Sequence, residues 1–325
     1  MFSSASSLIE TLYGYKNSLL LMIANKNNIF NKIGYHELSI DEISTKTGFS
    51  TERLEIFLDN LVSMGLLNKK NKSYSNTDLA KQFLVSGGTN YLGNLVELER
   101  HVYQELITEN KMEYALSGGT NRFPKVDPQI YMDAMEYGVR FASLNMAKKV
   151  QKYIYPKKIL DLGGGPGEVA VTFCRVFPEA EAFVYDLPEM LQCAEANIRK
   201  NNFESRIKLI EGDCLYGEYG KDYDLIVISN LLHFFNLIDI KNILQYVNLA
   251  LLDGGLLIIH DFFVDPESDS SKIAYMSALD WLALGVVFNY TIDDMKCMLN
   301  DYGLCCLEAN KLPMVPTSLV VARKS

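Results

Sequence analysis

The chain has 325 residues, of which 48% are hydrophobic and 22% charged, the composition of an ordinary globular protein with one large core or two modest ones. Its formal net charge of -9 argues against a surface that neutralises phosphates, so we expect no nucleic-acid partner. A neutral small-molecule partner fits this charge balance better.

The first ninety or so residues have the pattern of short helices. Capping-box sequences at 7–10 and 39–42 predict two helix starts. Apolar residues at helical spacing over 54–64 predict a further helix, which Gly65 ends. A polar, lysine-rich tip between two apolar positions then predicts a small hairpin. The order of these elements predicts an all-helical domain of winged-helix type over residues 1–90, with the hairpin as its wing.

Residues 91–150 also have a helical pattern, but it is interrupted. Ser117-Gly-Gly-Thr120 and Pro124 mark a loop between two helical stretches. We therefore predict a helical bridge between the winged-helix domain and the rest of the chain.

From Lys157 onward, short apolar strands alternate with helical stretches. Strands roughly 20 to 30 residues apart with helices between them are typical of βαβ units, so residues 151–325 are predicted to form an α/β domain with a doubly wound, Rossmann-like parallel sheet. The predicted strands are 158–161, 182–186, 207–210, 223–229 and 256–261, followed by two more at 304–307 and 318–322.

A glycine-rich turn follows the first of these strands. Gly163, Gly164, Gly165 and Gly167 lie where the strand should turn into a helix, so the backbone can approach a ligand with no Cβ in the way. Dinucleotide-binding enzymes use a similar turn, and the glycines alone do not distinguish between the cofactors.

Three aspartates at successive strand ends make that distinction. Asp161 ends the first strand and Asp213 follows the third, and Asp186 ends the second, where its carboxylate can accept hydrogen bonds from both hydroxyls of a ribose. Acids in this register suit a ligand with an amino group and a cationic sulfonium, and suit a pyrophosphate poorly. They predict S-adenosylmethionine (SAM) as cofactor and S-adenosylhomocysteine (SAH) as product.

Three neighbours, Leu187, Cys214 and Ser229, are predicted to border the same cofactor. The alternative for each aspartate taken alone is a turn or helix-cap role, which is common for Asp at strand ends.

The six cysteines include no CxxC pair and no metal-ligand spacing, so we expect reduced thiols in a cytoplasmic protein and no metal. The best apolar stretch, 19–24, is far shorter than the roughly 18 residues that span a bilayer. No basic segment precedes an apolar run near the N-terminus, so neither an export signal nor a membrane partner is expected.

With these motifs in place, the chain resembles the small-molecule O-methyltransferases of the caffeate, hydroxyindole and antibiotic-tailoring kind. The likeness covers the winged-helix region, the bridge with its loop at 117–123, Asp161-Leu-Gly-Gly-Gly165 and Glu211-Gly-Asp213. It implies methyl transfer from SAM to a hydroxyl of a small aromatic metabolite, as in secondary metabolism. It also implies a homodimer formed through the N-terminal domain and a bridge that contributes to the substrate pocket.

The resemblance also implies catalytic residues. The family's general base is a histidine just beyond the fourth strand, which corresponds to His233 in Ile228-Ser-Asn-Leu-Leu-His233, and its acidic partner at the end of the fifth strand corresponds to Asp261. A third family acid corresponds to Asn289, which is not a carboxylate. This departure leaves N-, S- or C-methylation by positioning alone as an alternative. A capping or packing role is the alternative for His233 itself, and His260 should face away from Asp261.

The segments that line the acceptor pocket in the resembling family contain several aromatic, Met and Asn residues here. For each of them, packing in the core is the alternative role. They are Phe141, Met146, Trp281, Phe288 and Asn289.

Two other classes of protein share parts of this pattern. A DNA-binding regulator would use the winged helix, with Thr51-Glu-Arg53 opening its second helix, although the chain is acidic. An NAD-dependent oxidoreductase would share the glycine turn and Asp186 but would not need Asp213.

Overall fold

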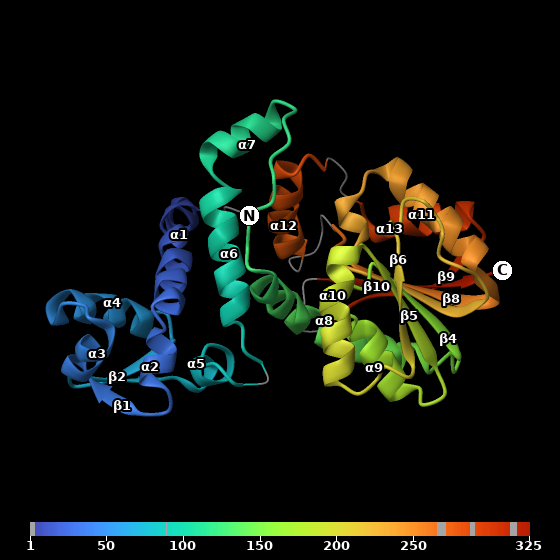
Figure 1. The fold of residues 1–325 in the computed structure, drawn as a ribbon. Helices are drawn as coiled ribbons and strands as arrows, with labels where there is room; N and C mark the ends of the chain where they lie inside the picture. The colour runs from blue at the N-terminus through green and yellow to red at the C-terminus, as the bar shows by residue number, and fades with distance from the viewer. Residues whose placement is uncertain (1–3, 89, 265–270, 287–289, 313–316) are drawn as a thin grey trace. The chain divides into compact units, whose positions relative to one another are not determined.

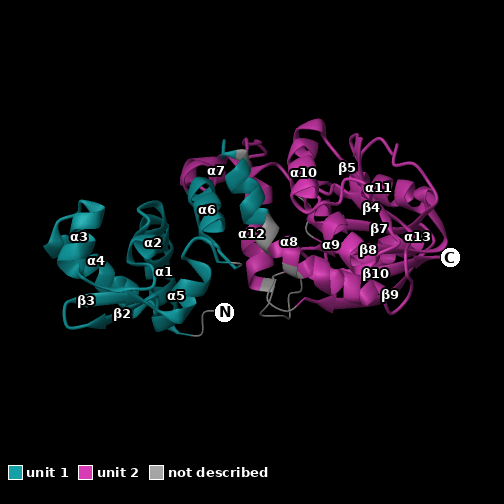
Figure 2. Cartoon of the chain, turned by 60° about the horizontal axis from the view of Figure 1, so that its bottom comes forward, with its two compact units in different colours: residues 1–103, 125–137 teal, residues 104–124, 138–325 magenta. Residues whose placement is uncertain are grey.

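The computed structural model describes residues 4–88, 90–264, 271–286, 290–312 and 317–325. The chain divides into two compact units, shown in Figure 2. Unit 1 contains residues 1–103 and 125–137, and unit 2 contains residues 104–124 and 138–325. The segment 91–150 that the sequence sets apart is thus shared between both units.

Unit 1 consists of helices and a small antiparallel sheet. Its helices are α1 (Ala5–Lys26), α2 (Ile29–Ile33), α3 (Ile40–Thr47), α4 (Thr51–Ser63), α5 (Asp78–Phe83) and most of α6 (Gly93–Glu105). The strands β1 (Glu37–Ser39), β2 (Leu67–Lys70) and β3 (Ser73–Asn76) pair in the order β1-β3-β2. The hairpin β2–β3 confirms the predicted wing. Strand β1 is an addition that the sequence did not indicate, because three residues are too few to show a period.

The helix starts in unit 1 follow capping chemistry. The predicted capping box of α3 is confirmed, since Glu42 accepts from the Ser39 N–H at 2.7 Å and the Ser39 hydroxyl accepts from the Glu42 N–H. The predicted start of α1 at Ser7 is wrong by a few residues. Ser4 is the N-cap, and Ser7 acts as its partner three residues on, so the helix already begins at Ala5.

Unit 2 contains a seven-stranded sheet with the order β6-β5-β4-β7-β8-β10-β9. Strands β4 to β8 are parallel, and β10 pairs antiparallel with both β8 and β9. All seven predicted strands are confirmed. They are β4 (Lys158–Leu162), β5 (Glu181–Asp186), β6 (Ile207–Glu211), β7 (Tyr223–Ser229), β8 (Leu251–Asp261), β9 (Leu304–Lys311) and β10 (Ser318–Lys324).

Helices cover both faces of this sheet (Figure 1). Helices of unit 2 are α7 (Glu109–Leu116), α8 (Pro128–Val150, which begins in unit 1), α9 (Glu168–Val176), α10 (Pro188–Lys200), α11 (Leu237–Ala250), α12 (Ser271–Ala283) and α13 (Ile292–Asp301), with a short 3₁₀ turn at Leu232–Phe234. None of the helices in the described ranges has both the length and the apolar character needed to cross a bilayer.

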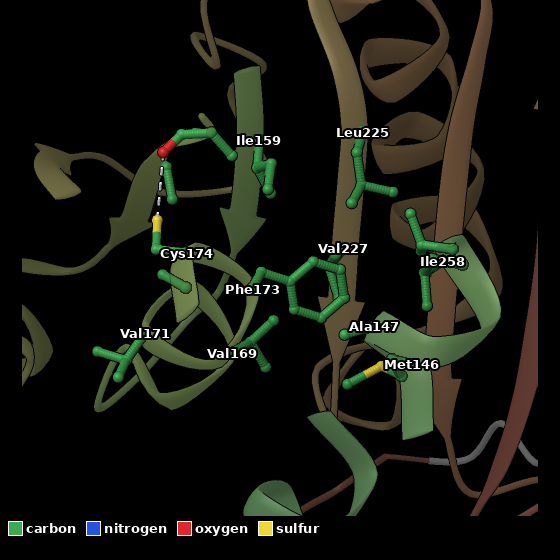
Figure 3. Close-up of a cluster of buried hydrophobic side chains, with 14 of the residues drawn as sticks. Met146, Ala147, Ile159, Val169, Val171, Phe173, Cys174, Leu225, Val227 and Ile258 are labelled. Atoms are coloured by element: carbon green, nitrogen blue, oxygen red, sulfur yellow. Dashed lines mark hydrogen bonds between the residues drawn. The ribbon is translucent and has the colours of Figure 1, made fainter. Parts of the chain in front are cut away.

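Each face of the sheet has its own hydrophobic core. Alternate residues of the strands point to opposite faces, so Val227 and Ile258 pack with α8 and α9, whereas Ile228 and Ile259 pack with α11 and α13. Figure 3 shows part of the core on the side of α8 and α9, where Phe173 lies near Val227 and Ile258. The two cores fix the strands, and the carboxyl ends of β4 to β8 therefore meet at one edge of the sheet.

Candidate active site

The glycine turn lies at the carboxyl end of β4, directly before α9. Gly163 and Gly165 have positive φ angles of 67° and 50°, which side-chain-bearing residues rarely adopt. A Cβ on Gly163 would lie 2.7 Å from the Leu231 side chain, and one on Gly164 would lie 2.7 Å from the Asp161 carboxylate carbon. The turn therefore packs tightly and presents only backbone at this edge.

Asp161 is completely buried beneath the turn. Its Oδ2 accepts a hydrogen bond from the Ala170 N–H at 3.1 Å, and its Oδ1 has no hydrogen-bond partner among the described residues. Burial raises the pKa of this carboxyl to about 7, and the neighbouring charges of Asp186 and Glu168 add to the increase. A buried carboxylate oxygen without a partner suits a cationic ligand. The Ala170 N–H at the start of α9 already donates to Asp161, so it is not free to bind a phosphate.

Asp186 is held at the end of β5 by main-chain donors. Its Oδ2 accepts from the Gly165 N–H at 2.7 Å, and its Oδ1 accepts from the Leu187 N–H at 2.8 Å. Burial raises the pKa of this carboxyl, although both hydrogen bonds act against the increase. Each carboxylate oxygen keeps a second acceptor position, so Asp186 can still bind two hydroxyl groups.

Asp213 is joined to Asp186 through the backbone, because the N–H of Gly212 donates to the Asp186 carbonyl at 3.0 Å. The Oδ1 of Asp213 accepts from the Leu215 N–H at 2.9 Å, and its Oδ2 has no partner in the described part of the chain. The next residue, Cys214, is buried, and burial raises the pKa of its thiol to about 12. That thiol stays neutral at physiological pH, so Cys214 offers an apolar contact.

His233, just beyond β7, and Asp261, the last residue of β8, form a buried pair. The imidazole Nδ1 lies 2.6 Å from Asp261 Oδ1, and Asp261 also accepts from the N–H groups of Leu232 and Phe262 at 2.8 and 2.7 Å. Burial alone would raise the pKa of Asp261, but its interaction with His233 and the hydrogen bond from the Phe262 N–H lower the pKa below the ordinary value. An ionised Asp261 accepts a hydrogen bond from Nδ1–H, which leaves the lone pair of the neutral imidazole on Nε2.

Aromatic rings surround this imidazole. Trp281 of α12 stacks on it with a centroid distance of 4.4 Å and an interplanar angle of 25°. Phe234 lies against it at 4.2 Å, and Phe262 contacts both His233 and Trp281 edge-on at 5.5 and 5.1 Å. His233 is thus held in an apolar, aromatic environment with only Asp261 hydrogen-bonded to Nδ1.

Models of two known domains match the chain. The model of the O-methyltransferase domain matches residues 106–291, and the model of the O-methyltransferase dimerisation domain matches residues 9–86. The chain belongs to the O-methyltransferase family. It is a SAM-dependent methyltransferase, so the family match decides against the NAD-dependent oxidoreductase and the DNA-binding regulator.

Relatives of this O-methyltransferase extend over the full chain. The N,N-dimethyltransferase OxyT of Streptomyces rimosus is 24% identical over 99% of this chain and 97% of its own. The tetracenomycin polyketide synthesis 8-O-methyl transferase TcmO of Streptomyces glaucescens is 24% identical over 98% of this chain and 96% of its own. The solved structure of human N-acetylserotonin methyltransferase in complex with SAM has the same fold, with a TM-score of 0.83, 19% identity and 100% of both chains covered.

His260 and Ser229 form a separate polar pair in the O-methyltransferase. His260 Nδ1 lies 2.8 Å from the Ser229 hydroxyl and Nε2 lies 2.6 Å from that of Thr317. Burial lowers the pKa of His260 to about 4, so the ring is neutral at physiological pH. Both ring nitrogens are occupied, which agrees with a structural role. The Ser229 hydroxyl, expected beside the cofactor, is therefore engaged by His260.

The residues expected in the acceptor pocket have different positions. Trp281 lies against His233, as described above. Met146 is fully buried in the core of Figure 3, and its expected place in the acceptor pocket stays a prediction. It shares with Ala142 and Val150 the stripe of α8 that packs against the sheet. Phe288 and Asn289 lie outside the described residues, as does the side chain of Phe141.

Phe234 and Phe262 are site residues that the sequence did not single out. Each directly follows a catalytic candidate in the sequence, and this was the one feature that could have identified them. It is a weak indication, because apolar neighbours are common throughout a chain. Among the described residues, no group of His, Cys, Asp and Glu is arranged to hold a metal ion.

Proposed function

We propose that this O-methyltransferase methylates a hydroxyl of a small aromatic metabolite, with His233 as general base. The observation that carries the proposal is the 2.6 Å contact between His233 Nδ1 and the buried carboxylate of Asp261. This contact selects the tautomer that has its free lone pair on Nε2, where no described group forms a hydrogen bond.

SAM supplies an electrophilic methyl group on a sulfonium when it is bound. We assign its binding to the edge formed by the glycine turn and the three strand-end aspartates. Asp186 would accept from the ribose hydroxyls, Asp213 from the adenine amino group, and Asp161 would provide negative charge near the cationic end. Gly163 and Gly165 allow the backbone to approach the cofactor, with Leu187 and Cys214 beside it.

Catalysis then requires two tasks of the protein. The first is positioning, because a displacement at the methyl carbon needs the acceptor and the sulfur in line. The second is removal of the acceptor's proton, which His233 Nε2 accepts. The charge of Asp261 stabilises the imidazolium that results, and the aromatic rings around His233 exclude water from the transfer. General-base catalysis of this kind contributes about 10²- to 10⁴-fold.

The acceptor is inferred from the surroundings of the base. Trp281, Phe234 and Phe262 form an aromatic boundary that suits a planar, apolar acceptor. The names of two relatives, an 8-O-methyl transferase of tetracenomycin polyketide synthesis and N-acetylserotonin methyltransferase, fit this class. A second candidate is an amine acceptor, which the relation to an N,N-dimethyltransferase favours.

We further propose a cytoplasmic homodimer. The dimerisation-domain match covers residues 9–86, and α1 exposes apolar residues that a second copy would cover. They are Leu8, Ile9, Leu12, Tyr13 and Tyr15. All six cysteines are unpaired, as expected for a reducing compartment. Light scattering coupled to size exclusion would measure a mass of twice the 36.7 kDa chain.

The experiment that tests the function is a methyl-transfer screen with phenols, catechols, carboxylates, amines and tetrapyrroles. With the best hydroxyl acceptor, His233→Ala should lower kcat by about 10²- to 10⁴-fold and leave the affinity for SAH unchanged. His36→Ala, at an exposed histidine of unit 1, is the matched control. Near-normal turnover of a hydroxyl acceptor by the His233 variant would refute the role of His233 as general base. If this variant turned over only an amine, the result would favour the amine as acceptor.

A further inference from the structure

The segment that follows β6, residues 212–222, is surrounded by tyrosine rings from several elements. We call Tyr185 of β5, Tyr219 of the segment itself, Tyr223 of β7 and Tyr246 of α11 the tyrosine cluster. Tyr219 packs edge-on against Tyr185 with a centroid distance of 5.3 Å and against Tyr246 at 6.1 Å. This cluster lies directly beneath the loop that carries Asp213.

Three hydroxyls of the tyrosine cluster donate to main-chain carbonyls of this segment. Tyr185 donates to the carbonyl of Asp213 at 3.2 Å, and Tyr219 donates to the carbonyl of Cys214. Tyr223 donates to the carbonyl of Tyr219 at 2.7 Å, which holds the second donor in place. Tyr185 and Tyr219 thus bind the backbone of Asp213, assigned to the adenine amino group, and of Cys214, which lies beside the cofactor in the proposed site.

The glycines of the segment make these approaches possible. A Cβ on Gly212 would lie 2.0 Å from the Tyr185 hydroxyl oxygen, and one on Gly217 would lie 2.5 Å from the Tyr246 ring. Gly217 also has a positive φ of 75°. The backbone can therefore contact the rings only because these positions have no side chain.

The hydroxyls remain donors under all physiological conditions. Burial raises the pKa of Tyr185 and Tyr219, and raises the pKa of Tyr223 to about 12. The hydrogen bonds of Tyr185 and Tyr219 hold the backbone of Asp213 and Cys214, as the N–H groups of Gly165 and Leu187 hold the carboxylate of Asp186. Both acids are fixed before a ligand arrives, by different donors.

We propose that Tyr185 and Tyr219 are positioning residues for the cofactor: their hydroxyls hold Asp213 and Cys214 in the conformation that recognises the adenine ring. This inference rests on the proposed role of Asp213. If the cluster only packed the core, it would need the tyrosine rings and not their hydroxyls. Removal of one hydroxyl oxygen therefore distinguishes a positioning role from a packing role.

The test uses Tyr219→Phe and, independently, Tyr185→Phe in the full chain. The matched control is Tyr246→Phe, because that ring packs on Tyr219 and its hydroxyl has no hydrogen-bond partner among the described residues. Isothermal titration would measure the affinity for SAH and for S-inosylhomocysteine, in which a carbonyl replaces the adenine amino group.

Loss of one hydroxyl should weaken SAH binding about three- to tenfold, the range of one hydrogen bond, and should lower the preference for SAH over S-inosylhomocysteine. At saturating SAM, kcat should stay within about twofold while KM for SAM rises. The control variant should match the parent protein in every measurement.

An unchanged preference in both tyrosine variants would overturn the inference, as would an equal loss in Tyr246→Phe. Asp213→Ala separates this failure from a failure of the proposed function. If that variant loses the preference and the tyrosine variants keep it, only the positioning role is wrong. If Asp213→Ala also keeps it, the adenine assignment on which the inference rests is wrong.

Discussion

Two regions of the same sheet edge differ in how they are built. In the cofactor region, at the ends of β4, β5 and β6, carboxylates are held mainly by main-chain donors such as the N–H groups of Ala170 and Gly165. In the base region, beyond β7 and β8, one carboxylate binds His233 and aromatic side chains enclose the ring. The first region is suited to recognise a charged ligand, and the second is suited to transfer a proton in surroundings that exclude water.

This difference separates the expected effects of mutation. A change in the base region should alter kcat and leave cofactor affinity intact, whereas a change in the cofactor region should alter affinity first.

The largest effect is expected for Asp261→Asn in the base region. The amide would donate to His233 Nδ1, so the ring would keep its hydrogen on Nε2 and could not accept the acceptor's proton. We expect kcat to fall by about 10²- to 10⁴-fold with SAH affinity within about twofold. Asp253→Asn, at an exposed position of the same strand, is the control. Turnover within tenfold of the parent protein would show that the tautomer does not matter.

A smaller effect is expected for Trp281→Leu. The stacked indole holds the plane of the imidazole at 4.4 Å, and an aromatic pair of this kind contributes about 0.5–1.5 kcal/mol. Loss of the stack should lower kcat roughly two- to tenfold, since 1.36 kcal/mol corresponds to a factor of ten. Trp281→Phe should retain most of the activity. If the Leu variant turned over as fast as the parent protein, or if both variants lost SAH binding instead, the ring would have no role in orienting the base.

The two regions also differ in how well the sequence predicts them. The cofactor region is local: each aspartate follows its own apolar strand, and the glycines lie within a few residues of Asp161. Strand periodicity therefore places these residues together at one edge. The family resemblance predicted His233 as general base and Asp261 as its partner. The structure shows the short distance between them.

The aromatic boundary of the base could not be derived in this way. Trp281 reaches His233 from α12, an element whose docking depends on long-range packing that no local pattern encodes. The same limit applies to α8, because the sequence of a helix rich in apolar residues does not show that the stripe with Met146 packs in the core of the sheet. The tyrosine hydroxyls that bind the Asp213 loop also depend on contacts between separate elements.

The smallest effect is expected in the cofactor region and concerns pH. Because burial raises the pKa of Asp161 to about 7, this carboxyl carries a proton at pH 6 and has mostly lost it at pH 8. Only the ionised form attracts a cation, so the affinity for SAM should rise as pH increases through 7, by up to about tenfold. Asp161→Asn keeps an oxygen to accept from the Ala170 N–H and removes the charge.

In that variant the pH dependence should be absent, and affinity should resemble that of the parent protein at low pH. Titration of SAM at pH 6, 7 and 8, with both proteins in matched buffers, measures the difference. A flat profile in the parent protein would mean that no ionisation of Asp161 between pH 6 and 8 affects SAM binding, and the contrast between the regions would then concern geometry alone. A slope of equal size in both proteins would assign the titration to another group at this edge of the sheet.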